Sequence, residues 1–308
     1  MNELPWRSYM NRWGVYITYR CNYNCSYCIQ KEWHVKQEVD RRPHRYFEEL
    51  PGEAWVKSLS SIQYRPPLAI ITGGEPSLHH DFYEIMIGLL QSKYILELNS
   101  NLSFDIGEFI KIFKRNNLIL PSLFTSYSPE YADPEEFIVK YIRLYDSKTI
   151  TKMHLNRVDC DIYPEFRSGR FDQNIKSFKA LCKKYNLEFT SSEMRSDKTT
   201  EASYRRVDRY GRKVTMRMEC TSGWVDIDPN GQIYNCHYHF TQGRHPFGNI
   251  KNIEELKYMP QYKEWFWCND YGWCDPCHEN GGHGLFRYRG RVFRRRKKNL
   301  FGIYKYIL

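Results

Sequence analysis

Three cysteines close together near the start of the chain place the strongest constraint on its fold and chemistry. Cys21, Cys25 and Cys28 form a C-x3-C-x2-C triad, and the alternating aromatic run at 13–19 predicts a strand that leads into them. Three thiolates on one loop suit a [4Fe-4S] cluster, which normally takes four cysteine ligands, so one iron stays open to a small molecule. Two other interpretations fit the spacing: a zinc site completed by a distant ligand such as His34, and three unrelated buried thiols.

A second motif follows the next predicted strand. The apolar run at 68–72 leads directly into Gly73, Gly74, Glu75 and Pro76. Glycines let the backbone approach a ligand closely, and Glu75 offers a fixed hydrogen-bond acceptor. A GGEP sequence alone is more often an ordinary turn. Placed after a strand that follows the C-x3-C-x2-C loop, it makes a pair of motifs that resembles the radical SAM superfamily.

The resemblance implies a role for the residues that match it. Cys21, Cys25 and Cys28 would hold a [4Fe-4S] cluster whose open iron binds the amino and carboxylate groups of S-adenosylmethionine (SAM). Tyr27 occupies the place of an aromatic residue near the adenine. The segment that would hydrogen-bond the methionine amino group is Gly73, Gly74, Glu75 and Pro76.

Two further cofactor contacts follow the third and fourth predicted strands. Ser100-Asn101-Leu102 resembles a T-N-G-type segment in which leucine replaces the usual glycine, and it would bring Asn101 to the cofactor. Ser126 matches a position where polar residues meet the ribose or carboxylate of SAM. A turn residue ahead of Pro129 is an equally good interpretation of Ser126.

Strands and helices alternate through the first two thirds of the chain, which predicts a parallel sheet with right-handed crossovers. With the resemblance, this becomes an α/β fold with a partial (β/α)6 TIM-like barrel, and motif residues at the carboxyl ends of strands fit the barrel rule. The predicted strands are 13–19, 68–72, 95–99, 122–126, 151–158 and 187–190, and the predicted helices are 53–64, 82–92, 106–116, 134–145 and 171–185.

Composition bounds the class of protein. The chain has 308 residues, enough for a full core and about two domains. We expect no signal peptide and no membrane span, because no charged start with an apolar stretch and no long apolar run occur. A cytoplasmic location follows, where the 10 cysteines are better explained by metal or cluster binding than by disulfides. The net charge of +10 favours an acidic or polyanionic partner.

A second cysteine group follows a polar segment at 196–213. Cys220 and Cys236 flank Asp228-Pro229-Asn230-Gly231, a strong hairpin turn. On spacing alone a zinc ribbon is favoured. Beside a radical SAM barrel, the C-x9–15-G-x4-C pattern resembles the twitch or SPASM extensions, which implies an auxiliary [4Fe-4S] cluster. A full SPASM domain has seven cysteines for two clusters, so five favour the shorter twitch type. The expected ligands are Cys220, Cys236, Cys274 and Cys277, with Cys268 as the alternative ligand.

Five segments are expected: an N-terminal extension (1–12), the radical SAM partial barrel (13–195), a linker (196–213), a small C-terminal cluster-binding domain of a β-hairpin plus a helix (214–285), and a basic tail (286–308). The tail carries eight Arg or Lys residues between Arg287 and Lys298 with aromatics between them. A solvated charged segment, a nucleic-acid contact, an anionic membrane surface and a guide for an acidic leader peptide are all compatible with it.

Two cysteines outside these groups have different expectations. Cys182 lies on the apolar stripe of the helix at 171–185 and is expected in the core. Cys160 follows the fifth strand at the barrel mouth and is a candidate hydrogen-atom donor, as thiols are in the peptide epimerases of the superfamily, or else an idle buried thiol. Candidate substrate contacts at the same end are His34, Asn156, Asp159, Glu193 and Arg195.

The function implied by the resemblance is reductive cleavage of SAM to a 5′-deoxyadenosyl radical that takes a hydrogen atom from a substrate. A peptide or protein is the first expected substrate (oxidation, epimerisation or cross-linking), a nucleic acid base or nucleoside the second, and an aminoglycoside-like alcohol the third. The auxiliary cluster would accept an electron, and flavodoxin or ferredoxin would be the reductant. A different class, a non-catalytic iron–sulfur sensor or nucleic-acid-binding protein, is disfavoured by Glu75, since a sensor needs no SAM site.

Overall fold

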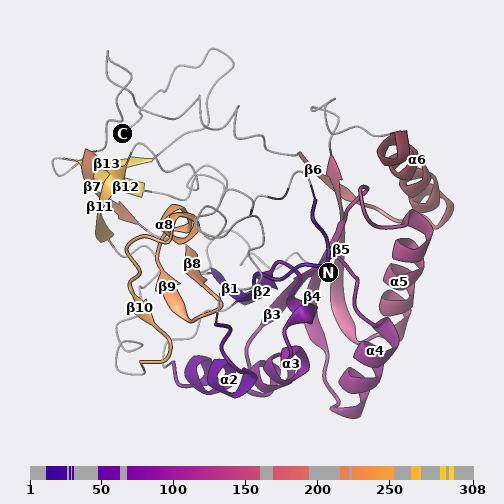
Figure 1. Ribbon diagram of the computed structural model, residues 1–308, viewed down its shortest axis with the longest axis horizontal. Helices are drawn as coiled ribbons and strands as arrows, with labels where there is room; N and C mark the ends of the chain where they lie inside the picture. The colour runs from indigo at the N-terminus through magenta and orange to yellow at the C-terminus, as the bar shows by residue number, and fades with distance from the viewer. Residues whose placement is uncertain are drawn as a thin grey trace.

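The structure is a computed structural model, and it describes residues 12–25, 28, 30, 48–62, 68–159, 169–193, 216–221, 224–252, 265–271, 285–288 and 291–294. The first two thirds alternate strand and helix, as predicted (Figure 1). The strands are β1 (Arg12–Thr18), β2 (Leu68–Gly73), β3 (Leu96–Ser100), β4 (Leu120–Tyr127), β5 (Ile150–Asp159) and β6 (Thr190–Glu193). The helices between them are α2 (Gly52–Ser60), η3 (Pro76–Leu78), α3 (Phe82–Gln91), α4 (Ile106–Arg115), α5 (Pro134–Ser147) and α6 (Gly169–Lys184).

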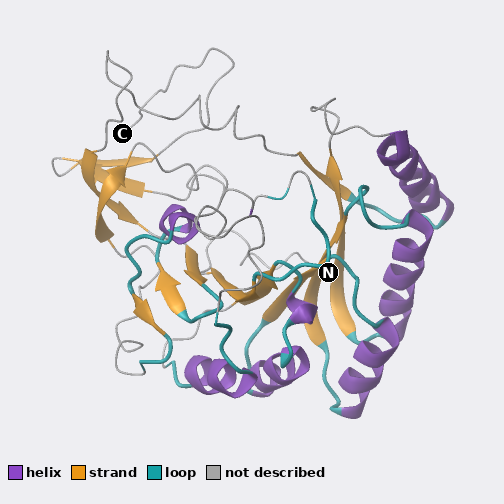
Figure 2. Ribbon diagram, in the orientation of Figure 1, coloured by secondary structure: helices purple, strands orange, loops and turns teal. Residues whose placement is uncertain are grey.

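These six strands lie side by side in sequence order, and each pairs in parallel with its neighbour. The helices α2 to α6 cover one face of the sheet (Figure 2). The sheet curves but stays open, with β6 at one edge, so the α/β fold with a partial barrel is confirmed. Helix ends follow local rules: the Asp133 side chain caps α5 by accepting the Glu136 N–H, and Pro134 takes the first helical position.

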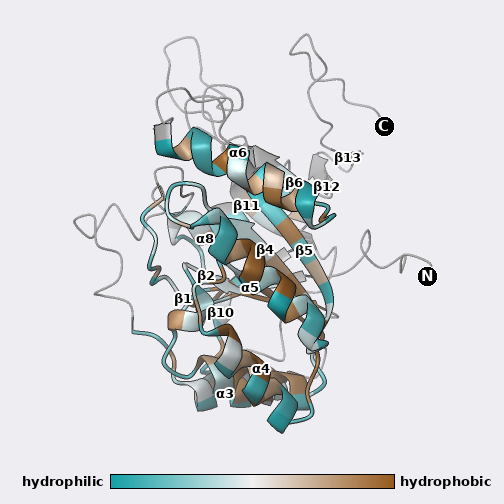
Figure 3. Ribbon diagram, turned by 90° about the vertical axis from the view of Figure 1, so that its right-hand side faces the viewer, coloured by the Kyte–Doolittle hydropathy of each residue, from teal (hydrophilic) through white to brown (hydrophobic). Residues whose placement is uncertain are grey.

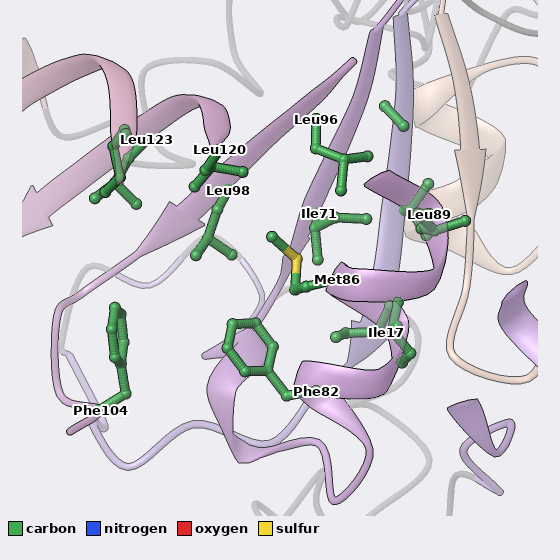
Figure 4. Packing of buried hydrophobic residues seen from close by; sticks show 14 of the residues in the cluster. Ile17, Ile71, Phe82, Met86, Leu89, Leu96, Leu98, Phe104, Leu120 and Leu123 are labelled. Atoms are coloured by element: carbon green, nitrogen blue, oxygen red, sulfur yellow. The ribbon is translucent and has the colours of Figure 1, made fainter. Parts of the chain in front are cut away.

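The core lies between the sheet and the helices. Along β1, Trp13, Val15 and Ile17 are buried against the helix layer, while Tyr16 joins a separate aromatic cluster on the other face. This alternation is the period-two pattern of a strand. Figure 4 shows how α3 supplies one side of the core, with Phe82, Met86 and Leu89 packed over strand residues such as Ile71 and Leu98. The hydropathy of α4, α5 and α6 alternates along each helix, as expected of helices with one face in the core (Figure 3).

The second part of the chain extends this sheet. The hairpin of β8 (Trp224–Ile227) and β9 (Gln232–Tyr234) is followed by α8 (His237–Gln242) and β10 (Gly248–Asn249). β8 pairs in parallel with β1, and the complete order is β10-β9-β8-β1-β2-β3-β4-β5-β6. The predicted hairpin at 228–231 is present. The expected boundary between a barrel and a second domain stays a prediction, and the sheet continues across it.

Four strands form a second sheet that the sequence did not predict. They are β7 (Met216–Thr221), β11 (Trp265–Tyr271), β12 (Leu285–Tyr288) and β13 (Arg291–Arg294), in the order β11-β7-β12-β13. The start of the segment expected as a basic tail therefore includes β13, and its role stays a prediction. No helix among the described residues is long and apolar enough to cross a membrane.

Candidate metal centre

The cysteine loop leaves the carboxyl end of β1. Cys21, Cys25 and Cys28 are all half-buried. The loop turns back on itself, since the Cys28 N–H donates to the Cys25 carbonyl over 3.1 Å. The Tyr23 N–H lies 3.4 Å from the Cys21 sulfur. The three thiols therefore stand at the end of the strands where barrel enzymes place their active sites.

Gly73 and Gly74 join the end of β2 to the chain that enters the cysteine loop. The Gly74 N–H donates to the Thr18 carbonyl over 3.0 Å, and the next N–H, that of Glu75, donates to the Arg20 carbonyl over 2.7 Å. A Cβ at Gly73 would lie 2.0 Å from the Thr18 oxygen, and one at Gly74 would lie 2.3 Å from the Arg20 oxygen. The glycines were expected to admit a ligand. What approaches them in the structure is the backbone leading into the cysteine loop.

Glu75 is fully buried beside this junction. Its Oε1 accepts the Ser77 hydroxyl over 2.7 Å and the Ser100 hydroxyl over 3.0 Å. Its Oε2 accepts the Asn101 N–H over 2.8 Å. Burial raises the pKa of Glu75, and these hydrogen bonds act in the opposite direction because they stabilise the ionised form. The carboxyl group is thus held in one fixed position by its own turn and by the segment that follows β3.

The turn after β3 has the shape that glycine normally gives it. Leu102 has a φ of +58°, a left-handed conformation that favours glycine, and its side chain is buried. The Leu102 N–H donates to the Ser100 hydroxyl over 3.0 Å. The Asn101 amide donates to the Asn22 side chain over 3.1 Å and lies 4.0 Å from the Cys21 sulfur. The departure from the T-N-G pattern at Leu102 therefore leaves the turn intact and Asn101 against the cysteine loop.

Contacts from three residues around the loop were not predicted. The Ser128 hydroxyl, beyond β4, lies 3.2 Å from the Cys25 sulfur. Tyr131 stacks on Tyr23 with ring centroids 5.2 Å apart. The buried Gln30 amide donates to the Gly73 carbonyl over 2.6 Å. One signal was available in the sequence: Ser128 follows the carboxyl end of a predicted parallel strand, as the predicted site residues do.

The Cys21 sulfur lies in an environment that disfavours an isolated thiolate. Burial raises the pKa of Cys21 to about 12, and the negative charges of Glu75, Cys25 and Cys28 add to the effect. Among the described residues, the one group whose three ligand atoms lie within 4.8 Å of one another is Glu49, His79 and His80.

The Glu49 group has its ligand atoms occupied by protein partners. Arg20 donates to both oxygens of Glu49 over 3.0 and 2.7 Å. The His79 Nδ1 accepts the Asp81 N–H over 3.0 Å, which leaves its Nε2 to donate to the Leu50 carbonyl. A metal ion at this group would have to break these bonds, which link Glu49 to Arg20 and His79 to the Leu50 carbonyl.

The structure describes some of the remaining predicted site residues and not others. Ser126 is half-buried on β4 and pairs in register with Asn156 on β5, whose side chain is buried and accepts the Thr190 hydroxyl over 3.1 Å. Asp159 and Glu193 are register partners at the ends of β5 and β6. These ends belong to the same rim as the cysteine loop. Four predicted residues lie outside the described residues: Tyr27, His34, Cys160 and Arg195.

The second cysteine group is described for three of its five members. Cys220 on β7 and Cys268 on β11 are buried, and Cys236, which precedes α8, is half-buried. Cys274 and Cys277 lie outside the described residues. Gly231, in the turn between Cys220 and Cys236, has a φ of +89°, which explains the glycine of the C-x9–15-G-x4-C pattern. The other cysteine, Cys182, is buried in the core, as predicted.

Comparison with known proteins identifies one family. The sequence model of the Radical SAM superfamily matches residues 15–185. No curated protein matches the chain.

The solved structures that resemble this chain include two named proteins. The structure of SuiB from Streptococcus suis has 10% sequence identity and a TM-score of 0.39, and it matches over 81% of this chain and 66% of SuiB. BtrN in complex with AdoMet and 2-DOIA has 14% identity and a TM-score of 0.44 over 83% of both chains. This chain thus spans just under two thirds of the length of SuiB.

Proposed function

This chain belongs to the radical SAM superfamily, and we propose from that premise that it is an enzyme that abstracts a hydrogen atom from a peptide or protein. Family membership implies SAM and a [4Fe-4S] cluster as cofactors. Cys21, Cys25 and Cys28 are the proposed ligands of this cluster. When bound and reduced, the cluster supplies the electron that cleaves SAM to methionine and a 5′-deoxyadenosyl radical.

One observation carries the proposal: the loop of three thiols is tied to a buried carboxyl group by backbone hydrogen bonds. The Glu75 N–H binds the chain just before Cys21, and the Glu75 side chain is held by Ser77, Ser100 and Asn101. A fully buried carboxylate is costly unless it has a partner. The methionine amino group of SAM, a cation, is the proposed additional partner of Glu75.

The other cofactor contacts are proposed around this pair. Asn101 and Ser126, with Gly73, Gly74 and Pro76, border the same rim, and Tyr27 is assigned to the adenine. Asn156 on the neighbouring strand is the proposed substrate contact with the firmest support, because it is buried and pairs with Ser126. The curved sheet would exclude water from the substrate.

We also propose an auxiliary [4Fe-4S] cluster in the second part of the chain. Cys220 and Cys236 would bind it, together with two of the three cysteines Cys268, Cys274 and Cys277. Its role would be to accept the electron left on the substrate, which makes the reaction an oxidation or a cross-link. Cys160 as a hydrogen-atom donor would instead give an epimerisation.

The ranking of the candidate substrates depends on the positive charge of the chain. The net charge of +10 and the eight basic residues between Arg287 and Lys298 support an acidic peptide leader. The same residues support the second candidate, a nucleic acid base or nucleoside in DNA or tRNA. We place the reaction in the cytoplasm, with flavodoxin or ferredoxin as the reductant.

The test is the iron and acid-labile sulfide content of the chain after anaerobic reconstitution, together with 5′-deoxyadenosine formation from SAM. About 8 of each per chain is expected for two clusters. Replacing Cys21 by alanine is expected to lower the count to about 4 and abolish 5′-deoxyadenosine, whereas Cys182→Ala should change neither. Bound zinc without iron, or cofactor cleavage that survives in the Cys21→Ala variant, would refute the proposal.

A further inference from the structure

The pairing of β7 with β11 fixes where Cys268 lies relative to Cys220. These strands are antiparallel, with Cys220 opposite Phe266 and Cys268 opposite Met218. Directly opposed residues share a face of the sheet, and so do residues two apart on one strand. Cys220 and Cys268 therefore stand on the same face of adjacent strands, in diagonal positions.

Burial supports this assignment independently. Cys220 and Cys268 are 7% and 3% exposed, whereas Trp267, the neighbour of Cys268 on the opposite face, is 59% exposed. One face of the pair of strands is thus closed and carries both thiols, and the other is open to solvent. A one-residue shift in register would put one of the cysteines on the open face.

The spacing of diagonal positions distinguishes a disulfide between the two cysteines from ligation of a shared cluster. Such positions are about 7–8 Å apart, beyond the range of roughly 4.4–6.8 Å between the Cα atoms of a disulfide. The ligands of a four-iron cluster bind separate irons, so they tolerate this separation.

The β8–β9 hairpin brings a third thiol toward the same place. Asp226 pairs with Tyr234, so the chain before β8 and the chain after β9 leave the hairpin at the same end. Cys220 lies at the end of β7 just before β8, and Cys236 lies two residues beyond Tyr234. Cys220 and Cys236 therefore flank the open end of the hairpin, four residues before β8 and two residues after β9.

We propose that Cys268 is a ligand of the auxiliary cluster, bound beside Cys220 and Cys236. This inference rests on the proposed function and deepens it, because the sequence pattern alone favours Cys274 and Cys277 together and treats Cys268 as an alternative.

The test isolates the auxiliary cluster in a full-length parent variant in which Cys21, Cys25 and Cys28 are all alanine. After anaerobic reconstitution, the parent is expected to hold about 4 iron and 4 sulfide per chain. Adding Cys268→Ala is expected to lower both to below about 1 and to remove the EPR signal of the reduced cluster. Adding Cys182→Ala, which removes a buried thiol from α6, should leave both unchanged.

A second variant separates ligation from folding. Serine keeps an oxygen ligand, so Cys268→Ser in the same parent is expected to retain part of the iron with an EPR signal of shifted shape. A purely structural cysteine would give an unshifted signal in both the serine and the alanine variants.

The outcomes are distinct for the two proposals. If the parent holds about 4 iron and Cys268→Ala keeps them with an unchanged EPR signal, the inference about Cys268 is overturned and the auxiliary cluster stands. If the parent holds no iron, or holds zinc instead, the auxiliary cluster itself is refuted, and the inference is lost with it.

Discussion

At the scale of single residues, the candidate centre depends on how closely two backbone segments approach. Gly74 lets the start of the cysteine loop pass within hydrogen-bond reach of the end of β2. Leu102 achieves a comparable fit without glycine, because its buried side chain and the Ser100 hydroxyl hold it in a left-handed conformation. Residue identity in a motif is thus less informative than the backbone shape that the residue supports.

Gly74→Ala tests this reasoning. The added Cβ would meet the Arg20 carbonyl at 2.3 Å, and a backbone atom cannot move aside as a flexible side chain can. We expect the cysteine loop to be displaced, the iron content to fall by about 4 per chain, and SAM binding to be lost. The measurement is iron content with SAM binding by calorimetry.

Gly107→Ala on α4 is the matched control, since its Cβ would meet only side-chain atoms, at 3.1 Å. This variant is expected to keep its iron and to gain up to about 1 kcal/mol from helix propensity. Full iron content in Gly74→Ala would show that the close approach does not position the ligands.

At the scale of elements, the β8–β9 turn is shaped by one carboxyl group. The Asp228 Oδ1 accepts the N–H groups of Asn230 and Gln232 over 3.1 and 2.8 Å. Burial raises the pKa of Asp228 to about 6. The turn therefore depends on a group whose charged form is disfavoured in the folded chain.

This gives a pH dependence with a defined sign. Since the folded-state pKa lies above the unfolded value of about 3.9, the folded chain holds a proton that the unfolded chain releases. The contribution of Asp228 is fully present below about pH 4 and is lost as pH rises through about 6. Asp228→Asn keeps the acceptor oxygen without the charge. Its stability relative to the natural chain should rise by up to about 3 kcal/mol between pH 4 and pH 7, measured by urea unfolding of the apo protein. A stability difference that does not change with pH would contradict this.

The sequence predicted the parallel sheet but not the smaller one, for a physical reason. The run at 68–71 is apolar throughout and lies between proline and glycine residues, so the strand is evident, and its partners follow from the alternation of strands with helices. By contrast, β7 pairs with β12, far along the chain, and β12 and β13 carry arginines that suggest a solvated segment. Local pattern identifies a strand, whereas the partner of an isolated strand depends on tertiary contacts.

The candidate site shows the same division. The cysteine loop and Glu75 were found because both follow predicted strands. Ser128 and Gln30 were not, because their roles depend on how the loop folds over the strand ends, and single polar residues in a loop carry no periodic signal.

At the scale of the whole molecule, one sheet contains both the strand that leads into Cys21 and the hairpin that precedes Cys236. β8 covers the edge of β1 that β2 leaves open, and Phe240 of α8 packs on Tyr16 with ring centroids 4.4 Å apart. The second part of the chain is therefore structural support for the strand that carries the first cysteines, whatever it binds.

Truncation tests that dependence. A chain that ends after residue 213 would expose the unpaired backbone of β1, which is a template for aggregation. We expect it to elute as aggregate in size-exclusion chromatography and to bind little iron. A chain that ends after residue 284 removes β12 and β13 but keeps the nine-stranded sheet, and it should elute as the full chain does. A monomeric, iron-binding fragment of residues 1–213 would show that β1 needs no such partner.

Because β1 pairs with β8, one edge of β1 stays unpaired during translation until β8 has been synthesised. Val15 pairs with Ile227, about 200 residues later in the chain. At about 5–20 residues per second, a ribosome needs roughly 10 to 40 s to make that stretch. During that interval the strand that leads into Cys21 has one bare edge. Chaperone capture of the nascent chain, and iron delivery timed after release from the ribosome, would both protect it.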